Sequence, residues 1–493
     1  MEAEFLYQQG LPPQATYVFK HALIQEAAYQ ALLRSTRQQH HQRLAQVLEG
    51  RFPHLCETQP ELLAQHYTEA GLMTHAIPYW QRAGQRAIER SAYVEAISHL
   101  TRGLELCKRL PETIEHSRQE LDLQMTLGSA LAATKGNAAP ETGHAYTRAR
   151  ALCQRVGETP QLFSVLVGLG QFYMNRGEFQ TARELAEHML SLAQRVHNPV
   201  DLGNAHIMLG NVLWSVGEWA TARRHLERGI AFSQPLQHCS HSLHNSTHPG
   251  VFGLCRLAQV LWYLGYPDQA LQRSQEALTL AQELSHPESL ATALVFAADI
   301  HSRRREGQRT YEQAEAARVL SGEQGFAFRL AQATILRGWA LVEQGQGEAG
   351  LAQIRQGLAA QRAGGVATAA NLTLLAEASR KVGQLEEGLR VVAAAQGSHR
   401  AELYRLQGEL LLTRSSEHQS EAETCFCQAL DLARRQEAKS LELRATMSLA
   451  RLWQQQGKRT EAHALLAPVY GWFTEGFDTA DLQEAKALLE ALA

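Results

Sequence analysis

The sequence predicts an all-α fold, a right-handed superhelical solenoid of stacked helix pairs. The main observation is a recurring spacing in which a small residue is followed seven positions later by glycine and five positions later by another small residue. Repetition of one helix-turn-helix unit is typical of stacked arrays, which bind partners more often than they catalyse reactions. Six copies carry the spacing: Gly170/Gly177/Ala182, Gly210/Gly217/Ala222, Ala258/Gly265/Ala270, Gly338/Gly345/Gly350, Ala376/Gly383/Gly388 and Ala450/Gly457/Ala462.

Each position of the spacing has a steric reason. In the first copy, Gly177 is expected to end the first helix in the left-handed conformation, which costs glycine little. The second helix is expected to restart at Glu178. Gly170 and Ala182 are expected where the two helices cross, because a bulky residue there would overpack the crossing. The spacing therefore predicts both the turn and the packing of a helix pair.

Two long intervals between copies each contain a degenerate copy. One centres on Ala298, and the other starts at Gly408 with a turn two residues longer before Ala422. Between Val366 and Arg400 the second helix of a pair is expected to be short, and the continuity of the array is in question from Gln396 to His399. These eight copies, together with the rest of an array that is expected to begin near residue 59, predict nine or ten helix pairs.

Composition narrows the class of protein. The 493 residues are 45% hydrophobic and 20% charged, with a formal net charge of −3. Such a balance gives no overall field for nucleic acid or for an anionic membrane. No apolar run could span a bilayer and no signal segment begins the chain. The 7 cysteines are expected to be reduced thiols, so we expect a cytoplasmic protein.

The helix-pair spacing resembles the tetratricopeptide repeat, whose usual period is about 34 residues. Here the copies are nearer 40 residues apart, as between Gly170 and Gly210. In this respect the chain is similar to the extended repeats of maltose-regulator-like signalling proteins. The tryptophan and tyrosine positions of the family's first helix are mostly aliphatic in this chain.

The first 50 residues lack the spacing. The segment "TYVFKHALIQEAAYQALLRSTRQQHHQRLAQVLE" begins with a strand-like stretch from Thr16 to Lys20 and continues as helix. It resembles the segment that closes the ATPase module of bacterial adenylate/guanylate cyclase–AAA ATPase fusion proteins, whose C-terminal region is tetratricopeptide-like. Further strings, such as "AIPYWQRAGQRAIERSAYVEAISHLTRGLELCKRLP", extend the resemblance over nearly the whole chain.

This resemblance implies three regions. Residues 1–58 would be the tail of a winged-helix-like, ATPase-associated module, residues 59–395 a tetratricopeptide-like array, and residues 396–493 further repeats after a shortened one. The chain would be the sensor arm of such a signalling protein, encoded separately or split from it.

We expect a non-catalytic chain, with no catalytic, cofactor-binding or metal-binding residues. No phosphate-cradling glycine-rich loop is found, because Gly457-Lys458 has Leu452 and Arg459 where the motif requires glycine and serine or threonine. The expected function is a protein-interaction and sensor scaffold that regulates a cyclase/ATPase signalling protein in cis or in trans. The expected partner is a protein or peptide in a concave groove, with no membrane or direct nucleic-acid binding. The alternative is the ligand-sensing arm of a maltose-regulator-like transcriptional activator.

Two groups of side chains in the sequence are possible metal ligands. The segment from Ser233 to Cys255 contains His238, Cys239, His241, His244, His248 and Cys255, which are ligand types for zinc. Since their spacing matches no zinc motif, a polar inter-repeat loop is the preferred interpretation. Cys425 and Cys427 are expected on different faces of one helix, which excludes a shared metal.

The basic run from His301 to Arg309 is interpreted as a solvated turn, with a phosphate contact as the alternative. Tryptophans recur near the boundaries between repeats. We prefer the interpretation that they pack between repeats over the alternative that they line a ligand groove. These are Trp80, Trp214, Trp219, Trp262, Trp339, Trp453 and Trp472.

Overall fold

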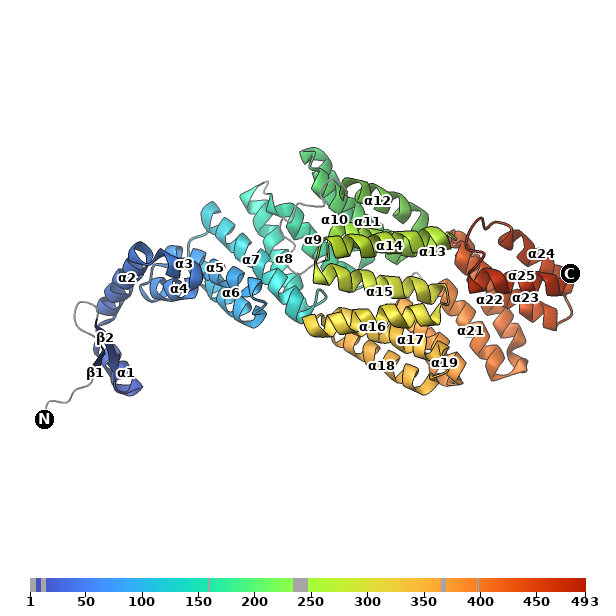
Figure 1. Cartoon of the computed structure of the whole chain (residues 1–493). Helices are drawn as coiled ribbons and strands as arrows, with labels where there is room; N and C mark the ends of the chain where they lie inside the picture. The colour runs from blue at the N-terminus through green and yellow to red at the C-terminus, as the bar shows by residue number, and fades with distance from the viewer. Residues whose placement is uncertain are drawn as a thin grey trace. The chain divides into compact units, whose positions relative to one another are not determined.

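The computed structural model describes residues 6–9, 15–157, 160–233, 247–364, 369–395, 397 and 399–493. Contacts divide the chain into two compact units, residues 1–134 with 144–159, and residues 135–143 with 160–493. Both are almost entirely helical, as the sequence predicts (Figure 1). The chain is therefore an all-α helical-repeat protein.

The N-terminal unit begins with an antiparallel pair of strands. Leu6 pairs with Phe19 and Gln9 with Thr16. Strand β2 falls within the segment predicted to be strand-like, and helices follow it. The elements are β1 (Leu6–Gln9), β2 (Thr16–Phe19), α1 (Ala22–Ala31), α2 (Arg34–Arg51), α3 (Pro53–Thr58), α4 (Pro60–Glu69), α5 (Met73–Glu89), α6 (Tyr93–Cys107), α7 (Ile114–Lys135) and α8 (Pro140–Val156). The winged-helix-like assignment and the boundaries expected after residues 58 and 395 remain predictions.

A polar contact organises the core of this unit. The carboxylate of Glu49 on α2 accepts hydrogen bonds of 2.5 Å from the hydroxyls of both Tyr67 and Tyr79. These two hydrogen bonds hold the pKa of Glu49 below its usual range. Trp80, which is 2% exposed, donates to Thr68 over 3.0 Å and is part of the same core. Helix α2 is thereby joined to the first helix pairs.

The second unit alternates two kinds of helix. We call the first helix of each pair an A helix and the second a B helix. The A helices are α9 (Gln161–Asn175), α11 (Pro199–Val216), α13 (Pro249–Tyr263), α15 (Pro287–Arg303), α17 (Ala327–Glu343), α19 (Ala369–Val382), α21 (Arg400–Arg414) and α23 (Lys439–Gln455). The B helices are α10 (Phe179–Val196), α12 (Trp219–Ser233), α14 (Pro267–Glu283), α16 (Gly307–Gln324), α18 (Gly347–Gly364), α20 (Leu385–Ala394), α22 (Gln419–Arg435) and α24 (Arg459–Tyr470), with α25 (Ala480–Leu492) closing the chain.

The predicted turn glycines all adopt the left-handed conformation. Their φ angles are 76° at Gly177, 88° at Gly217, 91° at Gly265, 84° at Gly345, 83° at Gly383 and 80° at Gly457. Helix α10 begins at Phe179, one residue after the expected start, because Glu178 is the N-cap. In the degenerate copy that centres on Ala298, Arg305 takes the place of the turn glycine and adopts the same left-handed conformation, with a φ of 63°.

The other departures from the regular spacing also match the expectation. The degenerate copy that starts at Gly408 contains the 3-10 helix Ser416–His418 before α22, which accounts for the longer connection between its two helices. Helix α20 has 10 residues, so the second helix of that pair is short. One apolar core joins Ala376, Val392 and Leu406, so the packing of α19 and α20 continues into α21.

The prediction that the two helices of a pair cross closely at the small residues is confirmed in some copies and is wrong in one. A methyl group on Gly338 would lie 2.6 Å from the carbonyl oxygen of Gly350, and one on Gly350 would lie 2.4 Å from that of Gly338. At Gly170 it would meet the terminal methyl of Met208 at 3.4 Å, an ordinary contact. Hence Gly338 is sterically required, whereas Gly170 is not, because Met208 leaves room beside it.

These two glycines make a matched pair of variants. We expect Gly338→Ala to lower the free energy of unfolding by about 1–3 kcal/mol, because the two backbones must move apart. Gly170→Ala should have no such cost and should stabilise its helix by up to about 1 kcal/mol. Thermal and urea unfolding of the full chain measure both effects. Equal destabilisation by the two variants would contradict the packing described for α17 and α18.

Candidate binding surface on the inner face of the array

The A helices form the inner layer of the second unit. Each A helix from α11 to α21 contacts the next A helix, and α23 contacts α25. Because the A helices are packed closer to one another than the B helices are, the array curves with its A helices on the concave side. Side chains on this face are the ones that a partner inside the curve would meet.

One position on this face is polar in nearly every copy. It is the residue directly after the small A-helix residue, and it is Asn211, Gln259, Asp299, Trp339, Glu377, Glu409 or Arg451 in successive A helices. Hydrogen bonds join several of these residues to the neighbouring helix. Gln259 donates to Asp299 over 2.6 Å, and the indole of Trp339 donates to Glu377 over 3.1 Å.

Ion pairs extend this polar face into the C-terminal repeats. Arg405 donates to both carboxylate oxygens of Glu402, over 2.7 and 3.0 Å, and Ser448 donates to Glu409 over 2.6 Å. Glu402 is 8% exposed. Burial opposes its ionisation, but the guanidinium groups of Arg405 and Arg444 outweigh burial and hold the pKa of Glu402 below its usual range. Glu402 is therefore a buried carboxylate that its two arginine neighbours hold in the charged form.

The C-terminal repeats close onto the central repeats. Figure 1 shows α23–α25 beside the end of α13, and α13 and α23 are in contact. Ser440, at the start of α23, donates to the carbonyl oxygen of Trp262 over 2.5 Å. Arg444 donates to the carbonyl oxygen of Arg303 over 2.7 Å and to Asp481 over 2.6 Å. We call this contact between residues 262–306 and residues 439–484 the seam.

Arg304 is the central cation of the seam. Its side chain is 2% exposed, and it donates to Asp268 over 3.1 Å, to Asp478 over 2.9 Å and to Glu306 over 2.8 Å. Burial opposes ionisation of Glu306, but hydrogen bonds from His301 and Arg304 outweigh burial and lower the pKa of Glu306 to about 2. Both partners are thus held in their charged forms.

The loop between α24 and α25 caps a helix of the central repeats. Glu475 accepts from the backbone N–H groups of Asp268 and Gln269, over 3.0 Å each. These are among the first amides of α14, which have no partner within their own helix. In return, the N–H of Gly476 donates to Asp268 over 2.9 Å.

The interpretation of the basic run as a solvated turn is therefore wrong for its first half. Arg305 donates to Glu484 over 2.6 Å and approaches Asp481 at 3.5 Å, and Arg304 is buried. Arg309 remains exposed. Asp478, Asp481 and Glu484 lie more than 170 residues later in the sequence, so no local pattern could have paired them with this run.

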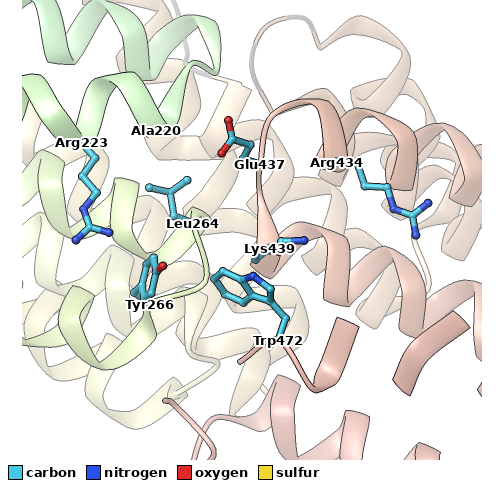
Figure 2. Close-up of a pocket in the computed structure, with 8 residues that line it drawn as sticks. All are labelled: Ala220, Arg223, Leu264, Tyr266, Arg434, Glu437, Lys439 and Trp472. Carbon is cyan, nitrogen blue, oxygen red and sulfur yellow. The ribbon is translucent and has the colours of Figure 1, made fainter. Parts of the chain in front are cut away.

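A cleft of about 350 Å³ opens beside the seam. Figure 2 shows Arg223 over Tyr266 on one side, and Lys439 beside Trp472 on the other. Lys439 donates to Glu442 over 2.7 Å, and Arg223 pairs with Glu227 at 2.8 Å. Arg434, the third cation of the lining, pairs with Glu442 at 2.9 Å. Since all three lining cations have carboxylate partners, we assign no ligand to this cleft.

An aromatic cluster lies behind the inner face. The ring of His399 contacts Trp214 and Tyr263, with a centroid distance of 5.5 Å in both cases. Burial lowers the pKa of His399 to about 3, so this histidine is neutral. Tyr263 also stacks on Trp219 at 4.3 Å. The packing interpretation is confirmed for Trp80, Trp214, Trp219, Trp262 and Trp339, which are at most 8% exposed, whereas Trp472 is 36% exposed.

The other sequence candidates do not form a site in the part of the chain that the structure describes. His238, Cys239, His241 and His244 lie outside that part, and His248 and Cys255 are on α13 or next to it. No group of three metal-ligating side chains occurs among the described residues. Cys425 is buried and Cys427 exposed, as expected for different helix faces. Gly457-Lys458 is a repeat turn, with Lys458 as the N-cap of α24.

Within the described residues, no helix is long and apolar enough to cross a bilayer.

The seam gives a matched test within the basic run. We expect Arg304→Gln to lower the free energy of unfolding by about 1–3 kcal/mol, because three carboxylates lose a buried cation. Arg309→Gln, which changes an exposed arginine of the same run, should change it by less than about 0.5 kcal/mol. Thermal unfolding measures both. Equal stability of the two variants would contradict the role of Arg304.

Comparison with known proteins supports the repeat assignment. Residues 161–234 match the family described as tetratricopeptide repeat. An uncharacterized protein, R02095, of Rhizobium meliloti (strain 1021) is 24% identical over 464 residues. The match covers 92% of this chain and 45% of that protein, so the chain spans about half the length of this relative.

Several solved structures are also similar. The apo form of RapI is 14% identical, with a TM-score of 0.47, covering 58% of this chain and 98% of that one. A Rap protein complexed with competence and sporulation factor is 13% identical, with a TM-score of 0.47 and coverage of 78% and 99%. Yeast Tom70 is 11% identical, with a TM-score of 0.34 and coverage of 92% and 96%. The match to the tetratricopeptide repeat family spans the two helix pairs α9–α10 and α11–α12, and the helix pairs that follow repeat the same spacing.

Proposed function

We propose that this chain is a non-catalytic scaffold that binds a segment of a partner protein on the concave face of its A helices. The observation that carries the proposal is the polar position after the small A-helix residue, which recurs from Asn211 to Arg451. Gln259 and Trp339 of this row are buried, and its other members are partly exposed. The partly exposed members offer hydrogen-bonding and charged groups along a curved surface, which suits an extended polypeptide.

The more specific proposal concerns the partner. The N-terminal segment from Thr16 resembles the end of an ATPase module, and we propose that the array regulates a cyclase/ATPase signalling enzyme in cis or in trans. The relative from Rhizobium meliloti is longer than this chain, which leaves room for further modules in proteins of this kind. A maltose-regulator-like transcriptional activator is the second candidate, because its sensing arm has the same extended repeats.

Closure of the seam favours a sensor over a static adaptor. The seam consists largely of ion pairs and hydrogen bonds between segments that are distant in sequence, such as Arg305 with Glu484. Contacts of this kind can be exchanged for contacts with a partner at a smaller cost than an apolar core. Partner binding on the inner face can therefore be coupled to opening or tightening of the seam.

A capture experiment with a charge-neutral variant tests the proposal. The purified chain is immobilised and incubated with lysate of its source organism, and retained proteins are identified by mass spectrometry. Glu377→Gln removes one inner-face charge, and we expect it to reduce retention of the partner about tenfold. Glu312→Gln on α16, whose residue is exposed, is the control and should retain the partner like the wild type.

The identity of the captured protein separates the specific proposals. A nucleotide-cleaving signalling enzyme supports the regulatory arm, and a DNA-binding activator supports the second candidate. Equal retention by the wild type and Glu377→Gln would contradict binding on the inner face. Clear ATP turnover by the purified chain, above that of a heat-inactivated sample, would contradict the non-catalytic assignment.

A further inference from the structure

Arg256 lies in an aromatic cage on the inner face of α13. Its guanidinium carbon is 3.8 Å from the ring centroid of Trp214 on α11, 5.3 Å from that of Phe252 and 5.1 Å from that of Phe296 on α15. Aromatic rings attract a cation through their faces but offer it no strong hydrogen-bond acceptor. The cage therefore positions Arg256 without neutralising it.

The charges around Arg256 do not balance. One of its terminal nitrogens donates to Gln259 over 2.5 Å, and Gln259 in turn donates to Asp299. Asp299 itself accepts from Arg303 over 2.8 Å. The nearby Arg329 pairs with Glu288 at 3.1 Å. Three guanidinium groups thus share two carboxylates, which leaves one positive charge in excess.

This excess has an electrostatic cost. Burial lowers the pKa of Arg256 to about 9, and the attraction of Asp299 offsets burial only in part. A buried cation without its own counter-ion destabilises a fold, so its presence calls for a compensating gain.

Unpartnered hydrogen-bonding atoms surround the same point. Among the described residues, neither the Nε of Arg256 nor the indole Nε1 of Trp214 has an acceptor, although Trp214 is only 8% exposed. The side-chain oxygen of Asn211, three residues before Trp214 on the same helix face, also lacks a partner there. The two unpartnered N–H donors, one on the unbalanced cation Arg256 and one on Trp214, form a receptor for an anion.

The site lies at the edge of the concave surface. Arg256, Asn211 and Phe252 are each partly exposed, whereas the Nε of Arg256 and the Nε1 of Trp214 are buried, so a carboxylate reaches these two donors when the side chains around them move aside. The excess of one positive charge matches a monoanion, which favours a carboxylate over a doubly charged phosphate.

We propose that Arg256 and Trp214 form a receptor for one carboxylate group of the polypeptide segment that binds the inner face. This proposal rests on the scaffold function proposed above. The carboxylate oxygens would accept from the Nε of Arg256 and the Nε1 of Trp214. An acidic side chain and a free C-terminus carry the same group, and the experiment distinguishes these two sources.

Three rhodamine-labelled probe peptides test the receptor on the full chain by fluorescence anisotropy. One is AADAA blocked at both ends, the second is AAAAA with a free C-terminus, and the third is AAAAA blocked at both ends. We expect at least one carboxylate probe to bind about tenfold more tightly than the blocked neutral probe. Which of the two binds more tightly identifies the source of the carboxylate.

Two variants and a control assign the binding to the site. Arg256→Gln should weaken the preferred probe about tenfold, and Trp214→Phe, which keeps a ring beside Arg256 but removes the N–H, should weaken it about threefold. Arg309→Gln is the exposed control and should bind like the wild type. Because Arg256→Gln removes an unbalanced charge, its melting temperature should equal or exceed that of the wild type, which also shows that it is folded.

Two results would overturn the receptor. One is equal binding of all three probes to the wild type, and the other is unchanged binding of the carboxylate probes to Arg256→Gln and Trp214→Phe. If the neutral probe binds as well as the others and Glu377→Gln weakens it, the inner-face scaffold stands and only the carboxylate receptor fails. If no probe binds, the receptor fails, and the capture experiment decides the scaffold separately.

Discussion

The buried guanidinium of Arg304 is the contact on which the closed form of the second unit depends. It joins a carboxylate of its own turn, Glu306, to Asp268 of the preceding repeat and to Asp478 near the C-terminus. Helix pairs in an array usually contact only their neighbours. Here a polar seam adds contacts between segments more than 170 residues apart in the sequence, such as Arg304 and Asp478. Bending of the repeats is therefore limited by ion pairs as well as by apolar packing.

Closure also determines the chemistry of the inner face. With the C-terminal repeats in place, Glu402 is buried beside Arg405 and Arg444, and His399 is held neutral against Trp214 and Tyr263. Arg256 is left as the unbalanced cation on this face. A partner that supplies one carboxylate would complete the charge balance, so binding and closure would stabilise each other. The proposed scaffold would report the presence of its partner in this way.

Sequence periodicity predicts the local structure well because each repeat position has a local steric cause. Gly177 and the other turn glycines adopt the predicted left-handed conformation, and the shortened helix α20 was expected from the spacing around Gln396. The close crossing predicted at Gly170 is wrong, because a methyl group there would make only an ordinary contact with the side chain of Met208 from the next A helix. The contact of Arg304 with Asp478 could not be predicted, because curvature over many repeats brings these two residues together. The cage of Arg256 was missed because its rings come from three neighbouring A helices and follow no short sequence motif.

Hydrogen exchange of the first amides of α14 tests closure of the seam most directly. The N–H groups of Asp268 and Gln269 would exchange quickly in an open array, because initial helix amides have no acceptor within their own helix. In the closed form both donate to Glu475. We therefore predict that both amides are protected in the full chain and lose that protection in Glu475→Ala. Rapid exchange of both amides in the wild type, or equal protection in the two proteins, would contradict the account.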